Sequence, residues 1–227
     1  MERLCMSKKF NNGYAFERYV FGEPILKREA HQIQASAITF SNALRRVIAN
    51  ANGHLHSQHP KTEVGRDLWH FVRKFLVAAK LPIQKFGFYS AIKTDADFRY
   101  GVDGFFYLVS QDKEALAIID AFLIPNFLIE KLENRQFSSC SQVQDELYRM
   151  KRIIRQVKQS NPNNELTWPQ FWQIYNNKES AKEFVRFKNS FVFTQYDLRR
   201  PKGIKELGKE IARSLFWQIR PGVKLSF

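Results

Sequence analysis

The sequence predicts a mixed α/β (α+β) protein in which helices flank one central sheet, and three observations support this class. Apolar residues recur every three or four positions in several segments, which is the period of a helix face. Three segments rich in aromatic and β-branched residues follow one another between residues 83 and 124, separated by short polar turns. The expected order, α, α, β, β, β, α, α, β, α, favours a single mixed sheet with an antiparallel strand meander.

Residues 1–60 are predicted to form an N-terminal arm and a helix that packs on the core. Residues 1–28 show no clear period and indicate an irregular arm or an edge strand. Residues 31–52 carry apolar side chains at helical spacing, and Asn-Gly at 52 and 53 ends that helix. A second helix is expected from Thr62 to Lys80, because the Thr62 hydroxyl can cap its first turn and Leu81-Pro82 stops it.

Residues 61–227 are predicted to form the core of what is expected to be one domain. Strands are expected at 83–93, 100–109 and 115–124, and sequential strands of this kind usually pair. Further along the chain we expect a long helix from Ser141 to Gln159 and a short helix near Trp168, followed by a returning strand at 190–198 and a closing helix from Gly203 to Trp217.

Charge indicates the kind of partner. The net charge is +14, and residues 146–227 hold 17 Lys and Arg against 7 Asp and Glu. A positive field of this size favours polyanions such as DNA, RNA or an acidic membrane, although a solubilising surface explains the charge equally well. No apolar stretch is long enough to span a membrane, and the N-terminus lacks the apolar segment of a secretory signal, so we expect a soluble cytoplasmic protein.

Two acids lie inside apolar strands. Asp103 stands in "RYGVDGFFYL" and Asp120 in "ALAIIDAFLI". In a symmetric hairpin about the polar turn "SQDK", these residues are directly opposed, with Cβ atoms about 5 Å apart. Like charges so placed repel, and a divalent cation offsets this repulsion, Mg²⁺ being the usual choice for one or two carboxylates plus a phosphate. A protonated carboxyl or an inserted Arg or Lys would also offset it, and a slipped register would separate the acids.

These residues and their order resemble the core of the PD-(D/E)xK nuclease superfamily. A helix bearing Glu63 is followed by a strand, then by a strand with Asp103, then by a strand with Asp120. The resemblance covers about residues 61–124, with 190–217 as possible remaining core. It implies a restriction-endonuclease-like fold in which Asp103 and Asp120 hold Mg²⁺ and Glu63 is an optional ligand. The chain departs from the motif in two places: Phe122 stands where the family has Lys, and no Pro precedes Asp103.

Lys93 is a candidate replacement for the missing lysine. If the first two strands pair about the turn "TDADF", Asp103 lies opposite Ala91 and Lys93 sits diagonally beside it. A cation there could hold the attacking water or stabilise the phosphate charge. Simple exposure at a strand end is the alternative for Lys93. For Glu63, favourable contact with the helix dipole is the alternative.

Two basic groups are candidate nucleic-acid contacts. One lies on the helix 141–159 and the other precedes the last helix, where exposed N–H groups favour an anion. Solvated helix surface and a tight turn are the alternatives. The candidates are Arg149, Lys151, Arg152, Arg155, Lys158, Arg199, Arg200 and Lys202. His54-Leu55-His56 has the spelling used by some metal-dependent nicking enzymes, but it is expected to lie in a polar loop.

Together these features predict a Mg²⁺-dependent DNA endonuclease that acts as a homodimer, because cutting both strands needs two sites or two events. The alternatives are a non-catalytic nucleic-acid-binding or assembly protein with a decayed nuclease-like fold, which the absent lysine favours, and an RNA-processing enzyme, since charge alone does not distinguish DNA from RNA.

Overall fold

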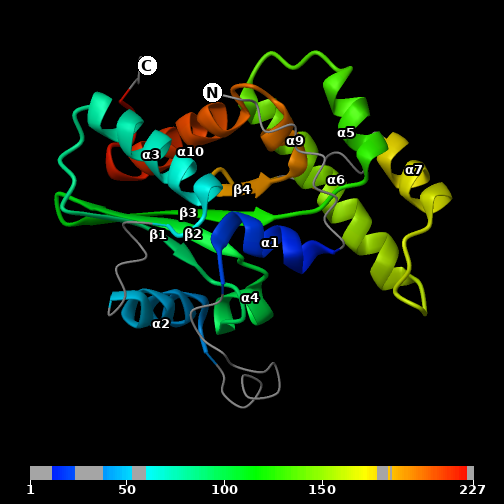
Figure 1. Cartoon of the computed structure of the whole chain (residues 1–227), viewed down its shortest axis with the longest axis horizontal. Coiled ribbons are helices and arrows are strands. Elements are labelled where there is room, and N and C mark those ends of the chain that lie inside the picture. Colours follow the sequence, from blue (N-terminus) through cyan, green and yellow to red (C-terminus); the bar gives the residue numbers. More distant parts are fainter. Residues whose placement is uncertain (1–11, 24–37, 53–59, 178–183, 185, 224–227) are drawn as a thin grey trace.

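The computed structural model describes residues 12–23, 38–52, 60–177, 184 and 186–223. In that part of the chain, four strands form one sheet in the order β1-β2-β3-β4 (Figure 1). They are β1 (Lys85–Ser90), β2 (Gly104–Ser110), β3 (Lys113–Ala121) and β4 (Ser190–Phe193). The first three strands are antiparallel neighbours, and β4 runs parallel to β3. The predicted mixed sheet with its antiparallel meander is confirmed.

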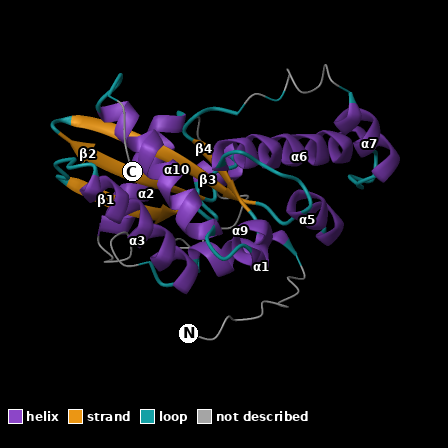
Figure 2. Cartoon of the chain, turned by 90° about the horizontal axis from the view of Figure 1, so that it is seen from above, coloured by secondary structure: helices purple, strands orange, loops and turns teal. Residues whose placement is uncertain are grey.

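Helices lie on both faces of the sheet (Figures 1 and 2). They are α1 (Gly13–Phe21), α2 (Phe40–Asn52), α3 (Glu63–Ala78), α4 (Asp95–Tyr100), α5 (Asn126–Glu133), α6 (Cys140–Ser160), α7 (Trp168–Asn176), α9 (Gln195–Arg199) and α10 (Gly203–Ile219). Thr62 caps α3 as predicted, because its hydroxyl oxygen accepts the Gly65 N–H at 3.0 Å. None of these helices combines the length and the apolar character that a membrane span needs.

The structure corrects three predictions of secondary structure. Residues 13–21 form α1, where an irregular arm or edge strand was expected, and the Asn12 side chain caps it by accepting the Ala15 N–H at 2.8 Å. A short helix, α4, occupies the expected turn between the first two strands. The strand expected at 190–198 ends at Phe193 and continues as α9. Of the helix expected at 31–52, α2 begins at Phe40, and residues 31–37 lie outside the described part.

Alternating side chains divide the core between the two faces. Phe86, Phe88 and Phe106 join a buried cluster with α1, α3 and α10. Tyr89 and Phe105 point to the other face and pack with α2. On that second face α6 covers β4, where it packs with other helices over a separate buried cluster. Asp103 and Asp120 therefore lie at a sheet that helices cover on both faces.

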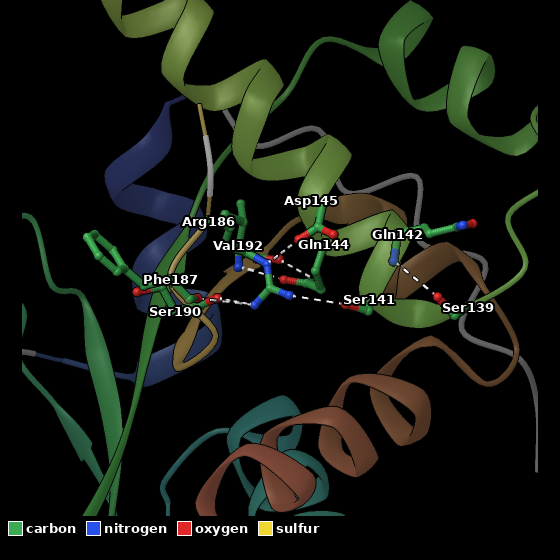
Figure 3. A network of polar contacts seen from close by, with 9 residues as sticks. All are labelled: Ser139, Ser141, Gln142, Gln144, Asp145, Arg186, Phe187, Ser190 and Val192. Atoms are coloured by element: carbon green, nitrogen blue, oxygen red, sulfur yellow. Dashed lines mark hydrogen bonds and ion pairs between the residues drawn. The ribbon is translucent and has the colours of Figure 1, made fainter. Parts of the chain in front are cut away.

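Two glutamines take the place of a further strand at the β3–β4 edge. Gln144 of α6 is fully buried and makes two bonds with Val192: it accepts the Val192 N–H at 2.8 Å and donates to the Val192 carbonyl at 3.1 Å (Figure 3). Gln218 of α10 does the same for Leu116, on the part of β3 that β4 does not cover, with distances of 3.1 and 3.0 Å. An edge closed in this way does not present a free template for another strand.

Candidate functional site

The register of the β2–β3 hairpin brings Asp103 and Asp120 together. Gly104 pairs with Ile119 and Phe105 with Ile118. Asp103 and Asp120 are each one step beyond the last of these pairs, and therefore lie opposite each other at the end of the sheet. The turn falls at Gln111 and Asp112, as predicted. Both acids are buried, with 6% of each exposed.

Two glycines shape the chain on either side of Asp103. Gly101 ends α4 with a φ of 63°, in the left-handed region that favours glycine. Gly104 leaves room for the ring of Phe21, with which any Cβ at position 104 would overlap. The last turn of α1 therefore docks on the start of β2, and Glu17, one turn earlier, is brought towards Asp103.

Six ionisable side chains interact at this end of the sheet. They come from α1, α4, β3, α6 and the residue before β2, and we call them the polar cluster: Glu17, Asp97, Asp103, Asp120, Lys151 and Arg155. Lys151 Nζ forms an ion pair with Asp120 Oδ2, and Arg155 Nη2 lies 3.4 Å from the same oxygen. The predicted alternative of a cation reaching in beside the acids is therefore present.

Asp103 is bonded to the backbone of β3. Its Oδ2 atom accepts the Ala121 N–H at 2.7 Å. Burial, followed by the charges of Glu17 and Asp97, raises its pKa well above the usual value, while Lys151 and the Ala121 N–H act in the opposite direction. The native environment therefore disfavours the charged form of this carboxylate unless a further positive charge arrives.

The neighbours of Asp103 are perturbed as well. Burial raises the pKa of Glu17 and of Asp97, and the positive charge of Arg155 opposes both shifts. Burial and the nearby charge of Arg155 lower the pKa of Lys151 to about 7. Clusters of groups whose pKa values are displaced in this way are typical of functional sites, although structural ion-pair networks show them too.

The polar cluster has the charge and the donor atoms to accept a divalent cation. When its groups are all ionised, four carboxylates face two cationic side chains, which leaves a net charge of −2. Carboxylate oxygens are the ligands that Mg²⁺ prefers, and it is often held by only one or two of them, with water and substrate phosphate completing its shell. No three His, Cys, Asp or Glu side chains in the described residues converge on one point. Asp103 and Asp120 could therefore offer two carboxylates to a cation, although Asp120 already pairs with Lys151 and Arg155.

Of the other two predicted catalytic residues, Lys93 borders the polar cluster, because its backbone N–H donates to Asp97 Oδ2 at 2.7 Å, and Glu63 lies outside the cluster. The predicted β1–β2 register is confirmed, because Ser90 pairs with Gly104 and the Ala91 N–H donates to the Asp103 carbonyl at 2.8 Å. The chain nevertheless leaves the strand after Ser90, and the Lys93 ammonium lies 5.3 Å from the centre of the Tyr14 ring. Glu63 is in the first turn of α3, where burial and, after it, the charge of Glu63 raise the pKa of Tyr19 and of Asp67.

The predicted nucleic-acid contacts on α6 differ in their surroundings. Lys151 is only 5% exposed, so the expectation that it belongs to an outer basic face is wrong. Arg149 donates to the Tyr175 carbonyl and stacks on that ring at 4.8 Å. Arg152, Arg155 and Lys158 are exposed, and Arg155 also reaches Asp120. Of the five, these three have the placement of a phosphate-binding surface.

The second basic group is partly engaged within the protein. Arg199 donates to Asn126 Oδ1 at 2.8 Å. Arg200 pairs with Glu206 and lies 5.2 Å from the centre of the Tyr196 ring. Lys202 is exposed at the start of α10. The histidines at 54 and 56 lie outside the described residues.

Glu17, Asp97 and the inward position of Lys151 were not found from the sequence. A signal for Lys151 existed, because it follows Leu147 by four residues and precedes Ile154 by three, which is the spacing of the apolar face. Phe16 and Val20 gave a weaker signal for α1, since both are fully buried at a spacing of four. No short-range pattern shows that α1 docks beside Asp103.

Comparison with protein-family models, with curated protein sequences and with solved structures found no significant match.

Proposed function

We propose that this chain is a Mg²⁺-dependent endonuclease whose active site is the polar cluster. The observation that carries the proposal is the meeting of Asp103 and Asp120 across the end of the β2–β3 hairpin, with Glu17 and Lys151 beside them. The order of α3, the antiparallel strands β1, β2 and β3, and the later β4 and α10 supports the restriction-endonuclease-like core implied by the resemblance, with α4 inserted between β1 and β2 and α5, α6 and α7 between β3 and β4.

Five of the six members of the polar cluster have a role in this proposal. Asp103 and Asp120 would hold Mg²⁺, which would position and activate a water molecule for in-line attack on a phosphodiester. Glu17 replaces Glu63 as the acid supplied by a helix. Lys151 supplies from α6 the cation that the motif lacks at Phe122, and with Arg155 it favours the negative charge that develops on the phosphate.

Substrate binding would use charge outside the cluster. The exposed Arg152 and Lys158 lie on α6, the helix that carries Lys151 and Arg155. Contacts of this type bind the phosphate backbone and orient a duplex without reading its sequence. Cleavage of both DNA strands would require two such sites, for which a homodimer is the simplest arrangement.

A second function is favoured by one specific observation. Asp120 already has an internal cationic partner in Lys151, so the site could be neutral and inactive without metal. The protein would then bind nucleic acid or act in an assembly without cutting. Binding and cleavage must therefore be measured separately.

Nicking of supercoiled plasmid with and without Mg²⁺ tests the proposal. Wild-type protein should nick the plasmid only with the metal, and Asp103→Asn and Asp120→Asn should each lower the rate at least about a hundredfold while retaining DNA affinity. Isothermal titration should show Mg²⁺ or Mn²⁺ binding that both variants weaken.

Asp197→Asn is the matched control, because Asp197 is also a buried carboxylate but lies in the capping box of α9. It should leave nicking and metal binding unchanged. Tight, salt-sensitive DNA binding without cleavage or metal binding by wild-type protein would reject the nuclease and support the second function. RNA as the only cleaved substrate would make the protein an RNA-processing enzyme.

A further inference from the structure

A cavity of about 410 Å³ lies between α10 and the segment that leads into β4. Its charged lining residues are Arg186, Lys188, Arg213 and Glu210, and its aromatic lining residues are Phe187, Trp217 and the buried Phe191. Cavities of this size commonly bind small ligands or single groups of larger ones. None of its lining residues belongs to the polar cluster.

Two of the aromatic lining residues are exposed. Phe187, at 70%, is the most exposed large hydrophobic side chain of the described residues, and Trp217, at 44%, is about as exposed as Phe98 and Phe127 elsewhere. Exposing large rings costs free energy in water unless a partner covers them. Two such rings on one cavity indicate a ligand with a flat, partly apolar group.

The segment that carries Phe187 is held in place by Arg186. Arg186 Nε lies 2.8 Å from Asp145 Oδ1, and its Nη1 donates to the Ser190 carbonyl at 2.7 Å (Figure 3). The Arg186 side chain is only 7% exposed. Figure 3 shows the Phe187 ring directed away from this network. The ring is therefore presented outward from an anchored backbone.

Charge selects the class of ligand. The lining holds three cationic side chains, of which Arg186 is buried and paired with Asp145, and the whole chain carries +14. Arg213 pairs with Glu210, while Lys188 is exposed. Aromatic rings that stack on bases, combined with cations that bind the backbone, are the recurring elements of single-stranded nucleic-acid sites.

We propose that this cavity binds an unpaired nucleobase of the nucleic-acid substrate, stacked on Trp217 and Phe187. Ser141 also lines the cavity, and Lys151 of the polar cluster is ten residues further along the same helix, α6. At 1.5 Å per residue, the cavity and the acids are separated by roughly 15 Å along that helix, or about four base steps of B-form rise. The inference rests on the proposed function in taking nucleic acid as substrate, and it narrows the substrate to strands with an unpaired region close to the cut.

Fluorescence anisotropy in EDTA tests the cavity without cleavage. The probes are a labelled single strand of about twenty thymidines and a labelled duplex of equal length. Trp217→Ala and Phe187→Ala should each weaken single-strand binding at least about fivefold and duplex binding less than twofold. Phe127→Ala is the matched control, because Phe127 is 41% exposed and does not line the cavity; it should leave both affinities unchanged.

A second measurement reports on Trp217 itself. The single strand should quench the intrinsic fluorescence of wild-type protein, and Trp217→Phe, which keeps an aromatic ring, should remove most of that quenching. Equal weakening of single-strand and duplex binding, or no effect of either alanine variant, would overturn the inference. Competition by poly-glutamate that depends on Trp217 to the same extent would also overturn it, in favour of an acidic protein partner.

Failure of the nuclease proposal gives a different result. If wild-type protein never nicks a plasmid but the single strand still binds through Trp217, the cavity assignment stands and the enzyme assignment falls. If the protein nicks DNA through Asp103 but replacing Trp217 has no effect on single-strand binding, the enzyme assignment stands and the cavity assignment falls.

Discussion

Replacing Asp103 by Asn should stabilise the fold while removing activity. The Asp103 carboxylate is 6% exposed, and the charges of Glu17 and Asp97 repel it. An Asn at this position has nearly the same shape and can still accept the Ala121 N–H through Oδ1, where the present bond is 2.7 Å. The substitution therefore removes a disfavoured charge and keeps the contact.

The size of the effect follows from the burial of the charge. A buried ion costs several kcal/mol after relaxation, and here Lys151 and one backbone N–H offset part of that cost. We expect Asp103→Asn to raise the free energy of unfolding by about 1–3 kcal/mol at pH 8. Because the raised pKa of Asp103 means that native protein binds the proton more readily than unfolded protein, the advantage of Asn should shrink as the pH falls towards 4.

Urea unfolding at pH 8 and pH 4.5, with and without Mg²⁺, measures this effect. Saturating Mg²⁺ should stabilise wild-type protein and leave Asp103→Asn unchanged, since a ligand stabilises only the state that binds it. A loss of more than about 1 kcal/mol in the variant at pH 8 would refute the reasoning, because it would show that the charge of Asp103 is satisfied in the native protein.

Three further predictions concern the surrounding fold. Gln144→Ala should lower the free energy of unfolding by about 3–5 kcal/mol in urea titration, since it leaves the buried N–H and carbonyl of Val192 unpaired. A cost below about 1 kcal/mol would contradict the role of Gln144 in closing the edge of the sheet at Val192. Burial raises the pKa of Asp197 to about 7, so the free energy of unfolding of wild-type protein should fall as the pH rises from about 4 to about 7. Asp197→Asn should remove up to about 4 kcal/mol of that fall. Parallel pH profiles of the free energy of unfolding for the two proteins would count against this prediction. Gly104→Ala should cost about 1–3 kcal/mol because the new Cβ overlaps the Phe21 ring, and hydrogen exchange in α1 should speed up by more than exchange in α10; an unchanged protection pattern would argue against docking of α1 at this glycine.

The hairpin that carries the acids was predictable because its signals are local. A single polar turn and strict two-residue alternation fix the pairing of β2 with β3, and the register predicted from the turn "SQDK" is the one observed. The β1–β2 register followed in the same way, and the Ala91 N–H bonds to the Asp103 carbonyl. What differed was the backbone at Lys93: β1 ends at Ser90 and α4 occupies the connection, so Lys93 does not lie on the strand beside Asp103 but bonds through its N–H to Asp97.

The rest of the candidate site depends on contacts between distant segments. Glu17 reaches the acids only because α1 docks on the sheet, and this docking needs Phe21 on one segment and Gly104 on another. Lys151 was misplaced for a different reason. Its cationic neighbours suggested an outer basic face, although its spacing from Leu147 and Ile154 matched the buried one.

One consequence follows from the continuity of α6. This helix runs unbroken for 21 residues. The cavity lies at its first turn, and Lys151 and Arg155, the cationic partners of Asp120, lie beyond its midpoint. Inserting a single residue between these two regions would rotate one relative to the other by about 100°, while lengthening the helix by only about 1.5 Å. If the cavity binds a base and the polar cluster cuts, the geometry of α6 would fix both the distance between these two sites and their relative orientation. It would thereby fix how far from the bound base the substrate is cut.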